Sequence, residues 1–380
     1  MKRSGYFKTN LSGKLAYESF CPANLLPTPP IVVDTEMMQL LREAYYELGK
    51  LWGVSMLVPN KSLFISMYVR KEALLSSQIE GTQATLEDIF DPHMTSANHD
   101  VEEVIRYIEA LNYADERVKT LPISNRLIKE IHAVLLSSIR GKEKDPGAFR
   151  QTQNWIGPMG STLKTATFVP PNVVDMHHAL DQLELFIHNL DDVDPLIKIA
   201  LIHYQFETIH PFLDGNGRIG RLLISLLLRQ YGILDDGVLY LSYYLKKNRI
   251  EYYDRLTEVR IKGHYEAWIS FFLKGIIETS KHAIGCIEQL VALMNHHLDL
   301  IQDGDVRQNK SMLKLYHYMT SHPIMDIQKT ALALNLSYNT IASNIKHMMQ
   351  LGILREMTQK QRNRVFVYEE YLAILRDGTK

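Results

Sequence analysis

The sequence predicts a mainly α-helical fold, with one short β-hairpin in mid-chain and a small mixed module at the end. Apolar residues recur at helical spacing through most of the chain. Between residues 141 and 171 this pattern gives way to Gly, Pro and β-branched residues, which are typical of a hairpin. Near the C-terminus, two short β-rich runs surround a basic turn. These three observations set the fold class.

The N-terminal third is expected to be an irregular segment followed by helices. Residues 1–35 contain Pro22, Pro27, Pro29 and Pro30, which keep a backbone extended and irregular. Helical patterns follow from residue 35 to about 118, with one helix over residues 100–118. Ser124 is expected to be the N-cap of the next helix. We therefore expect a helical N-terminal region over residues 1–120.

The central region, residues 121–280, is expected to be the core of the protein. It contains the predicted hairpin, with strands within residues 147–157 and 161–170. Asp194 and Pro195 then read as the N-cap and first residue of a helix that runs to about residue 210. The helical stripe resumes at Arg218, so a short loop is expected to join two helices. Residues 281–305 are expected to form a separate linker helix.

The C-terminal module, residues 306–380, is expected to contain three helices and two strands. The helices are predicted over residues 311–320, over 327–335, and from Ser337 or Asn339 onward. The strands are predicted over residues 352–357 and 364–368. This order resembles a winged helix-turn-helix, with residues 337–351 in the position of a recognition helix.

The charge of this module suggests a DNA partner, and a protein partner is the alternative. From residue 306 onward the chain has 11 Lys and Arg against 5 Asp and Glu, although the formal net charge of the whole chain is −1. Lys346, Lys360, Arg362 and Arg364 are the candidates for phosphate contacts. The expected recognition face is polar without being strongly basic, which leaves protein contacts or dimerisation open.

Composition predicts a cytoplasmic protein without a membrane span. Cys21 and Cys286 are the only cysteines of the 380 residues, too few for a disulfide framework, and neither has neighbours in sequence that suggest a metal site. The first residues lack an apolar signal sequence, and no run of eighteen apolar residues occurs. The adjacent pairs 177–178 and 296–297 place their histidines on different helix faces, which makes them poor metal sites.

The most informative segment is HPFLDGNGRIGR, residues 210–221. Its glycines allow backbone N–H groups to approach phosphate oxygens, and Arg218 and Arg221 lie on one side of the following helix. Gly215, Gly217 and Gly220 also fit the dinucleotide fingerprint of Rossmann folds. That fingerprint follows a strand, whereas this segment follows a predicted helix, which disfavours a Rossmann site. We therefore expect a phosphate-binding loop between two helices.

The same segment resembles the core motif H-x-F-x-D/E-G-N-G/K-R-x-x-R of the Fic family, without a departure at its key positions. Members with an intact motif transfer AMP from ATP to a protein hydroxyl, within a mainly helical fold. The resemblance implies that His210 is the general base, that Asp214 holds Mg²⁺, and that Phe212 anchors the loop. The residues expected to contact ATP are Glu80, His210, Gly215, Asn216, Gly217, Arg218, Ile219, Gly220, Arg221 and Tyr253.

A second segment, SSQIEG at residues 76–81, resembles the inhibitory helix of some Fic proteins. Ser76 and Glu80 are four residues apart and share one face of a helix. By the resemblance, Glu80 pairs with Arg221 and keeps the γ-phosphate out of a productive position, with Gly81 closing the motif. The alternative is an ordinary surface glutamate beside a helix C-cap at Gly81.

Two further expectations come from the resemblance. The predicted hairpin corresponds to a flap whose edge, between Thr165 and Val169, docks an unidentified target protein by strand addition; a purely structural loop is the alternative. Tyr253 is expected near the adenine ring, although a tyrosine at helical spacing is also typical of a core. Homodimers are common among relatives, and a homodimer is expected here.

The sequence therefore indicates a self-inhibited protein adenylyltransferase. It is expected to transfer AMP to a Ser, Thr or Tyr hydroxyl of a target protein and of itself. One alternative is a DNA-binding regulator whose Fic fold only senses nucleotide. Another is a phosphodiesterase that removes AMP from the modified protein at the same site, with Glu80 positioning a water. The intact His210 favours an enzyme, because a sensor needs no general base.

Overall fold

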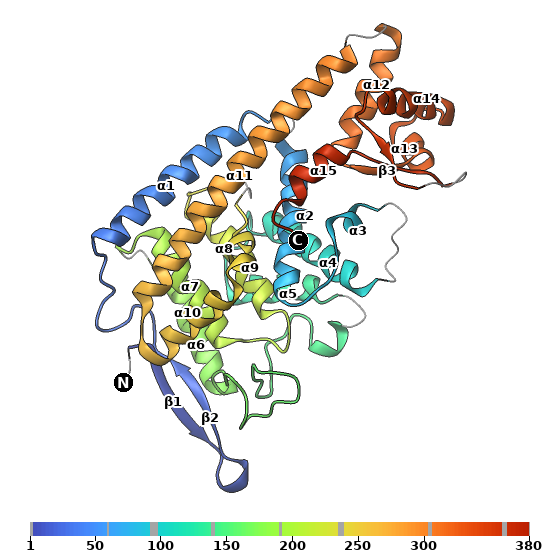
Figure 1. Cartoon of the computed structure of the whole chain (residues 1–380). Helices are drawn as coiled ribbons and strands as arrows, with labels where there is room; N and C mark the ends of the chain where they lie inside the picture. The colour runs from blue at the N-terminus through green and yellow to red at the C-terminus, as the bar shows by residue number, and fades with distance from the viewer. Residues whose placement is uncertain are drawn as a thin grey trace.

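The computed structural model describes residues 3–58, 61–91, 98–137, 141–189, 192–234, 239–302, 306–358 and 363–379. As predicted, the described chain is mainly helical, with two small antiparallel sheets (Figure 1). The described helices include none that is long and apolar enough to cross a membrane.

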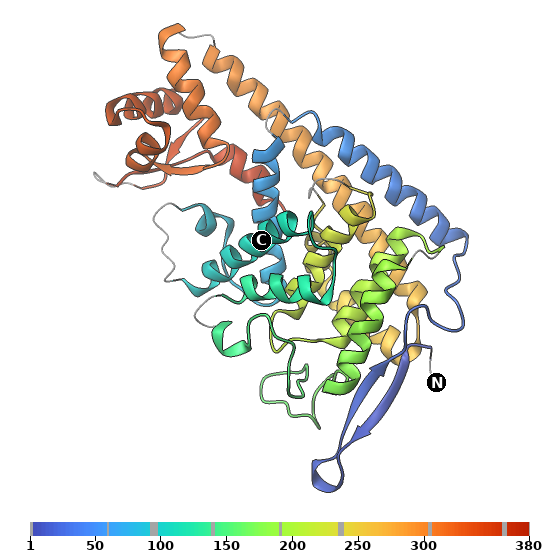
Figure 2. The same cartoon turned by 180° about the vertical axis from the view of Figure 1, so that it is seen from behind.

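Two long helices lie side by side along one flank of the molecule (Figures 1 and 2). They are α1, Thr35–Ser55, and α11, Tyr265–Gln302. Asp34 caps α1 by accepting a hydrogen bond from the Met37 N–H at 2.9 Å. Lys281 of α11 pairs with Glu43 of α1 at 2.6 Å. The residues predicted as a separate linker helix, 281–305, are therefore mostly the second half of α11, because apolar positions facing α1 continue across the expected boundary.

At the centre of the core, α7, Pro195–Ile209, packs against α6, Val173–His188; α8, Asn216–Gln230; α10, Arg249–Lys262; and α11. Its residues Leu196 to Ile209 are all buried. A helix surrounded on every side by other elements needs apolar residues on every face, as α7 has. Ser124 caps α5 as predicted, by accepting from the Leu127 N–H at 3.3 Å. The other helices of the core are α2, Lys61–Ile79; α3, Leu86–Phe90; α4, His99–Arg117; α5, Asn125–Leu135; and α9, Ser242–Lys247.

The prediction of an irregular chain over residues 1–35 was right for residues 23–34 and wrong for residues 5–22, which contain a β-hairpin. Strands β1, Gly5–Asn10, and β2, Tyr17–Pro22, pair antiparallel and project from the core (Figure 1). Phe20 is fully buried and its N–H donates to the Val169 carbonyl at 2.9 Å. Pro22 is the last residue of β2, where its missing N–H does not interrupt the pairing. Burial of β2 against the core thus outweighs the local effect of the prolines.

The C-terminal module has three helices, a three-stranded sheet and a final helix. In chain order it contains α12, Val306–Met319; β3, Ile324–Asp326; α13, Ile327–Leu334; α14, Tyr338–Gln350; β4, Arg355–Glu356; β5, Val365–Val367; and α15, Glu369–Arg376. The strand order is β3-β5-β4. Ser337 caps α14 by accepting from the Thr340 N–H at 3.1 Å, one of the two predicted starts. The order is compatible with a winged helix-turn-helix, and that assignment stays a prediction.

The end of the chain returns to the core. Arg376, the last residue of α15, pairs with Glu87 of α3 at 2.6 Å. His297 near the end of α11 hydrogen-bonds the Tyr368 hydroxyl at 2.7 Å. The C-terminus accordingly lies beside α2 rather than at the tip of the module (Figure 1).

Candidate active site

The HPFLDGNGRIGR segment joins α7 to α8, as the sequence predicts. Asp194 caps α7 by accepting from the Leu196 N–H at 2.9 Å, with Pro195 as its first residue. The helix ends at His210, whose φ of 50° is left-handed, and α8 begins after Gly215, whose φ is 79°. Two left-handed residues let the chain reverse within a few positions, so that the loop is presented at the N-terminus of α8.

Two side chains hold this loop in shape. Phe212 is fully buried, and its ring stacks on His132 with centroids 3.7 Å apart. Asn216, also buried, accepts from the Phe212 N–H at 2.8 Å and donates to the Phe212 carbonyl at 2.9 Å. Phe212 is therefore the anchor that the sequence predicts. Asn216, expected to contact ATP, acts here through its side chain on the loop itself.

His210 faces the cavity above the loop. Its carbonyl accepts hydrogen bonds from Arg150 Nε at 3.1 Å and Asn154 Nδ2 at 3.2 Å, which fix the backbone beside the flap. Burial lowers the pKa of His210 to about 4, and the backbone of Glu207 offsets only part of that effect. The imidazole is therefore neutral at neutral pH, the form in which it can accept a proton.

Arg221 is bound by the two residues of the predicted inhibitory segment. Its Nε donates to Ser76 Oγ at 2.8 Å, and its Nη2 donates to the Ser76 carbonyl at 2.9 Å. The same Nη2 contacts Glu80 Oε1 at 2.6 Å. Burial alone would raise the pKa of Glu80, but the charge of Arg221 lowers it overall, so Glu80 is ionised. The chain thus brings Ser76, Glu80 and Arg221 together from positions far apart in sequence.

Glu80 lies directly after α2 and over Gly217. A Cβ at Gly217 would collide with Glu80 Oε1 and Arg221 Nη1, so a larger residue would displace the ends of these two side chains. Gly81 has a φ of 106°, a conformation that favours glycine at a helix end. Gly81 thus has the geometry of a helix C-cap, as the alternative interpretation expected. Glu80, however, is paired with Arg221 and is not a free surface glutamate.

Arg218 and Asp214 pair with each other. Arg218 Nη2 lies 3.4 Å from Asp214 Oδ1, and its Nη1 lies 3.6 Å from Glu103 Oε2 on α4. Asp214 Oδ1 also accepts from the Gly215 N–H at 2.6 Å. The Asp214 side chain is 49% exposed, whereas that of Arg218 is 7% exposed. The loop therefore carries an accessible carboxylate at its edge, backed by a buried guanidinium.

A cavity of about 550 Å³ opens above the loop. The loop and the inhibitory segment supply one wall, the flap a second and α10 a third. The lining residues are Glu80, Trp155, Ile156, Gly157, Pro158, Thr167, Phe168, Glu207, His210, Gly217, Arg221, Arg249, Tyr252, Tyr253, Leu256, Thr257 and Arg260. Its volume suits a small molecule, and it contains His210, Glu80 and Arg221 together.

The flap is less regular than the predicted hairpin. A single antiparallel bridge joins Ile156 and Phe168, with N–H···O distances of 2.8 and 3.0 Å. The residues between them form turns, one of them closed by the Ser161 N–H on the Pro158 carbonyl at 3.0 Å. Proline and glycine in this stretch favour turns over a longer ladder. Of the expected docking stretch, residues 165–169, Thr167 and Phe168 line the cavity.

Not all residues expected to contact ATP reach this cavity. The Ile219 side chain is fully buried in the core and its N–H already donates to the Gly215 carbonyl at 3.0 Å. The Gly220 carbonyl bonds His203 Nδ1 of α7 at 3.0 Å. Neither residue lines the cavity, and their contact with ATP stays a prediction. Tyr253, by contrast, lines the cavity and is 39% exposed.

The structure adds wall residues that the motif did not indicate. Trp155 comes from the flap, Arg249 begins α10, and the guanidinium of Arg260 lies 4.0 Å from the centre of the Phe168 ring. Glu207 on α7 also faces the cavity, and burial raises its pKa to about 7. A carboxylate in the mostly apolar α7, which also carries Lys198 and His203, was the signal in the sequence for Glu207.

Glu207 gives the fold a pH dependence. Because the pKa of Glu207 is higher in the folded state than in the unfolded state, the folded protein keeps a proton on Glu207 between these two pKa values. The free energy of unfolding therefore falls as the pH rises from the unfolded to the folded pKa. Wild type should lose unfolding free energy between about pH 5 and about pH 8. In Glu207→Gln, which cannot titrate, this loss should be smaller by roughly 2–3 kcal/mol. Denaturant titrations at the two pH values measure this. The exposed Glu109→Gln is the control, and an equal loss in wild type and Glu207→Gln would contradict it.

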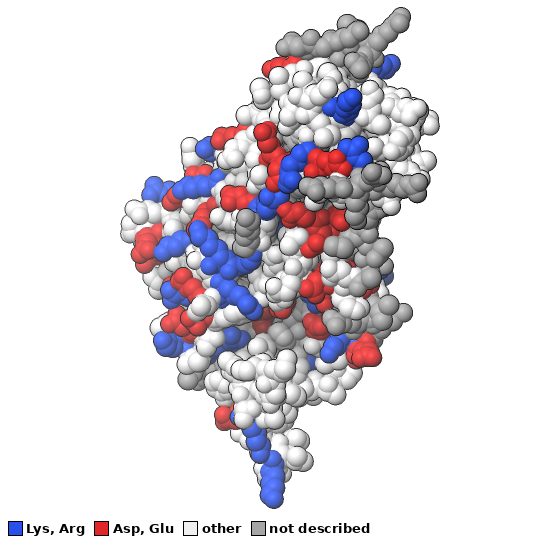
Figure 3. Space-filling model, turned by 45° about the vertical axis from the view of Figure 1, so that its right-hand side comes forward, with Lys and Arg blue, Asp and Glu red and all other residues white. Residues whose placement is uncertain are grey.

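The predicted DNA contacts of the C-terminal module find little support. Arg355 pairs with Glu369 at 2.7 Å and Arg364 with Glu356 at 2.6 Å. Positive and negative side chains are largely interspersed on the face shown in Figure 3. Lys360 and Arg362 lie outside the described residues. Arginines already paired with carboxylates gain less from a phosphate contact, and the described residues of the module form no continuous basic surface on the face shown in Figure 3, so DNA binding stays a prediction.

The fold and the site define a helical protein in which a loop with His, Asp and Arg residues joins two helices beneath a flap. Residues 38–116 match the Fic/DOC family N-terminal model and residues 122–228 match the Fic/DOC family model. Residues 38–228 are thus similar to the Fic/DOC family in its N-terminal and Fic regions. The second match contains the whole loop, and the first contains Ser76 and Glu80.

Curated relatives are similar over part of the chain. Protein adenylyltransferase Fic of Drosophila grimshawi is 33% identical over 117 residues, 30% of this chain and 22% of the relative. Protein adenylyltransferase fic-1 of Caenorhabditis elegans is 27% identical over 184 residues, 47% of this chain and 31% of the relative. The matches thus span less than a third of the length of these two relatives.

Solved structures share the fold. A Fic family protein from Desulfovibrio desulfuricans G20 superposes with a TM-score of 0.58 at 17% identity, covering 89% of this chain and 97% of that chain. Residues 134–508 of Fic-1 from C. elegans superpose with a TM-score of 0.50 at 20% identity, covering 66% and 72%.

Proposed function

We propose that this protein is a self-inhibited protein adenylyltransferase. It transfers AMP from ATP to a Ser, Thr or Tyr hydroxyl of a target protein, and of itself. The observation that carries this proposal is a single cavity that holds the neutral His210 beside Arg221, with Glu80 bound to that arginine. The names of the curated relatives support the reaction class.

In the proposed reaction the target hydroxyl oxygen attacks the α-phosphorus of ATP. A P–O bond to the target forms, the bond from the α-phosphorus to the oxygen bridging the α- and β-phosphates breaks, and pyrophosphate leaves. The hydroxyl proton goes to the neutral imidazole of His210. Backbone N–H groups at the start of α8 and the guanidinium of Arg221 stabilise the charge on the phosphates.

The loop fits the Mg²⁺ that the family implies. Asp214 offers one accessible carboxylate at the edge of the phosphate-binding loop, and Mg²⁺ favours one or two carboxylates together with phosphate oxygens. Asp214 would hold the ion, which when bound neutralises phosphate charge. The hydrogen bond from the Gly215 N–H fixes the carboxylate relative to the loop.

Inhibition follows from two contacts of Glu80. Its carboxylate occupies the space over Gly217 where phosphate oxygens would approach the loop. It also binds Arg221, which then has one donor fewer for phosphate. A negative carboxylate beside this loop repels the negative phosphates of ATP, so the inhibited state holds ATP unproductively or weakly.

The target protein is proposed to dock along the flap at residues 165–169 by adding a strand to its edge. Main-chain pairing makes few demands on target sequence, which is compatible with the irregular flap. The homodimer stays a prediction.

His210 should remain neutral well below neutral pH. Since burial sets its pKa at about 4, we expect its imidazole not to titrate between about pH 8 and about pH 6, unlike an exposed histidine near 6.5. Glu80 is one of the groups that raise this pKa, so Glu80→Gly should not shift it upward. Proton NMR of the histidine ring, assigned by its absence in His210→Ala, measures the midpoint. A midpoint between 6 and 7 would contradict the burial argument.

Tyr253 should contribute to nucleotide binding. Stacking of its ring on adenine is worth about 0.5–1.5 kcal/mol, so Tyr253→Ala should weaken ATP binding by roughly twofold to tenfold, and Tyr253→Phe by less. Calorimetric titration of the Glu80→Gly form with MgATP measures the Kd. Tyr46→Ala, at an exposed tyrosine of α1, is the matched control. Equal affinities for Tyr253→Ala and its parent would place the adenine elsewhere.

Intact-mass spectrometry of the Glu80→Gly protein after incubation with MgATP tests the proposed function. The proposal predicts adducts with the mass of an AMP group. If nucleotide binds and no adduct forms on the protein or on proteins of a cell extract, the proposal is contradicted and the nucleotide-sensing alternative is favoured.

A further inference from the structure

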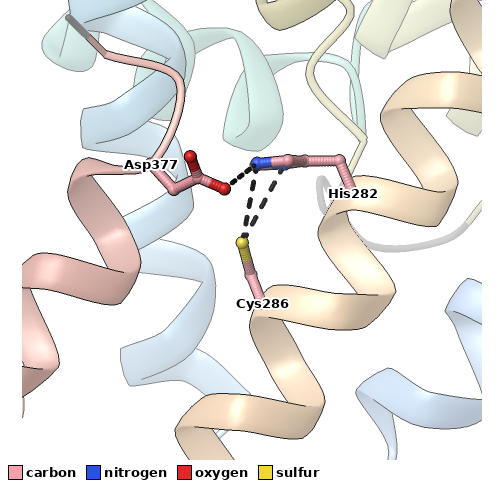
Figure 4. Close-up of side chains that lie close together, drawn as sticks. All are labelled: His282, Cys286 and Asp377. Atoms are coloured by element: carbon pink, nitrogen blue, oxygen red, sulfur yellow. Dashed lines mark hydrogen bonds and ion pairs between the residues drawn. The ribbon is translucent and has the colours of Figure 1, made fainter.

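A second cluster of ligand-type side chains lies away from the cavity. His282 and Cys286 are one turn apart on α11 and share a face, and Asp377 follows α15 in the C-terminal tail (Figure 4). His282 Nε2 is 3.0 Å from Asp377 Oδ2, and Cys286 Sγ is 3.8 Å from His282 Nε2. The three ligand atoms all lie within 4.8 Å of one another. Nothing in the proposed AMP transfer uses these residues.

The cluster is positioned by its surroundings. The ring of Tyr243 stacks on the His282 imidazole with centroids 4.0 Å apart and so fixes its plane. Gly378 lies against the same tyrosine, where a Cβ would collide with the ring. Its φ of 78° also favours glycine, and the tail is thereby turned so that the preceding Asp377 meets His282. Cys286 is buried, so its sulfur approaches the cluster from within the core.

The spacing of the donor atoms suits one tetrahedral metal ion. Ligand distances of about 2.0–2.1 Å for nitrogen, 2.0–2.2 Å for oxygen and 2.3 Å for sulfur place N and O about 3.4 Å apart and N and S about 3.6 Å apart. The observed 3.0 and 3.8 Å need only small shifts. One sulfur, one nitrogen and one oxygen favour zinc or cobalt over Mg²⁺ or Ca²⁺. A fourth position is left for water.

The charges around the cluster are compatible with a divalent ion. Lys71 of α2 is buried, its Nζ has no hydrogen-bond partner among the described residues, and its charge acts on Cys286 and Asp377. Binding of a divalent ion displaces the Cys286 thiol proton, and the ion with one thiolate and one carboxylate is then neutral overall, so the loaded cluster carries no net positive charge next to Lys71.

We propose that His282, Cys286 and Asp377 form a binding site for a divalent transition metal ion of the zinc type, which fastens the C-terminal tail to α11. The site is also connected to the inhibitory segment through Lys246. Lys246 Nζ donates to the Thr379 carbonyl at 3.1 Å and to Gln78 Oε1 at 2.8 Å, so the tail and the last turn of α2 share one contact. Gln78 is two residues before Glu80.

Cobalt substitution tests the site in the full-length protein without an affinity tag. After removal of bound metals, titration with Co²⁺ should give thiolate-to-cobalt charge-transfer absorption that saturates at one ion per chain and disappears on addition of Zn²⁺. Cys286→Ser and His282→Ala should lose this absorption. Cys21→Ser, which changes the other cysteine, should keep it. The same absorption in Cys286→Ser, or none in the wild type, would overturn the proposal.

Hydrogen exchange supplies a readout that does not depend on AMP transfer. With Zn²⁺, amides of the tail around Asp377 and of the last turn of α2 should exchange about tenfold more slowly, which corresponds to about 1.4 kcal/mol of added stability. In Cys286→Ser and His282→Ala, each checked for an unchanged thermal unfolding profile without metal, zinc should have no such effect. Equal slowing in wild type and in a variant that retains its fold would contradict the site.

Discussion

His210→Ala is expected to lower AMP transfer by about 10²–10⁴-fold, the usual contribution of a positioned general base. The change is made in the Glu80→Gly background, so that inhibition does not mask the loss. The reason is local, because the neutral His210 imidazole is the proton acceptor that we propose for the target hydroxyl. Initial rates of AMP incorporation at saturating MgATP measure the effect.

The control for this prediction is His264→Ala, since His264 is exposed at the start of α11 and outside the cavity. It should leave the rate unchanged. ATP affinity should change little in His210→Ala, because Arg221 and the loop backbone remain. A His210→Ala protein with intact nucleotide binding and an undiminished rate would remove the general base from the mechanism.

Glu80→Gly is expected to raise AMP transfer by about tenfold or more. The charged hydrogen bond between Glu80 and Arg221 is worth roughly 1.5–3 kcal/mol at most, reduced by solvent screening because the carboxylate is partly exposed. Its loss frees the guanidinium of Arg221 and clears the space over Gly217. Rates with wild type and variant at equal MgATP concentration give the ratio.

Glu103→Gln is the matched control, because Glu103 contacts Arg218 and not Arg221. A similar rise in both variants would indicate a general loss of negative charge rather than release of Arg221. The phosphodiesterase alternative predicts the opposite sign. If Glu80 positions a water for removal of AMP, Glu80→Gly should abolish that removal from a modified target, and an unchanged rate of transfer would contradict self-inhibition.

The parts of the site that are local in sequence were predicted correctly. The helix–loop–helix around residues 210–221 depends on an N-cap, a proline, glycines and an apolar stripe within a few turns, and each is visible in the sequence. The contact of Glu80 with Arg221 is long-range, and it was expected only because the segment around Ser76 resembles a known inhibitory helix. Physical patterning alone does not pair two such distant residues.

The parts that depend on tertiary packing were missed. The β1–β2 hairpin is stabilised by burial of Phe20 against the core, which outweighs the effect of the nearby prolines. The wall residue Trp155 belongs to the flap, which tertiary packing places over the cavity. The cluster of Cys286 and Asp377 joins residues 91 positions apart, and His282, four residues before Cys286, was not recognised in the sequence as a neighbour that suggests a metal site.

The most direct test of self-inhibited AMP transfer compares ATP labelled on the α-phosphate with ATP labelled on the γ-phosphate, using wild type, Glu80→Gly and Glu80→Gly/His210→Ala. The account predicts that α-label becomes attached to protein, most strongly in Glu80→Gly, and that γ-label never does. It also predicts that the double variant loses the α-label. Attachment of γ-label, or α-label that is equal in all three proteins, would contradict the account.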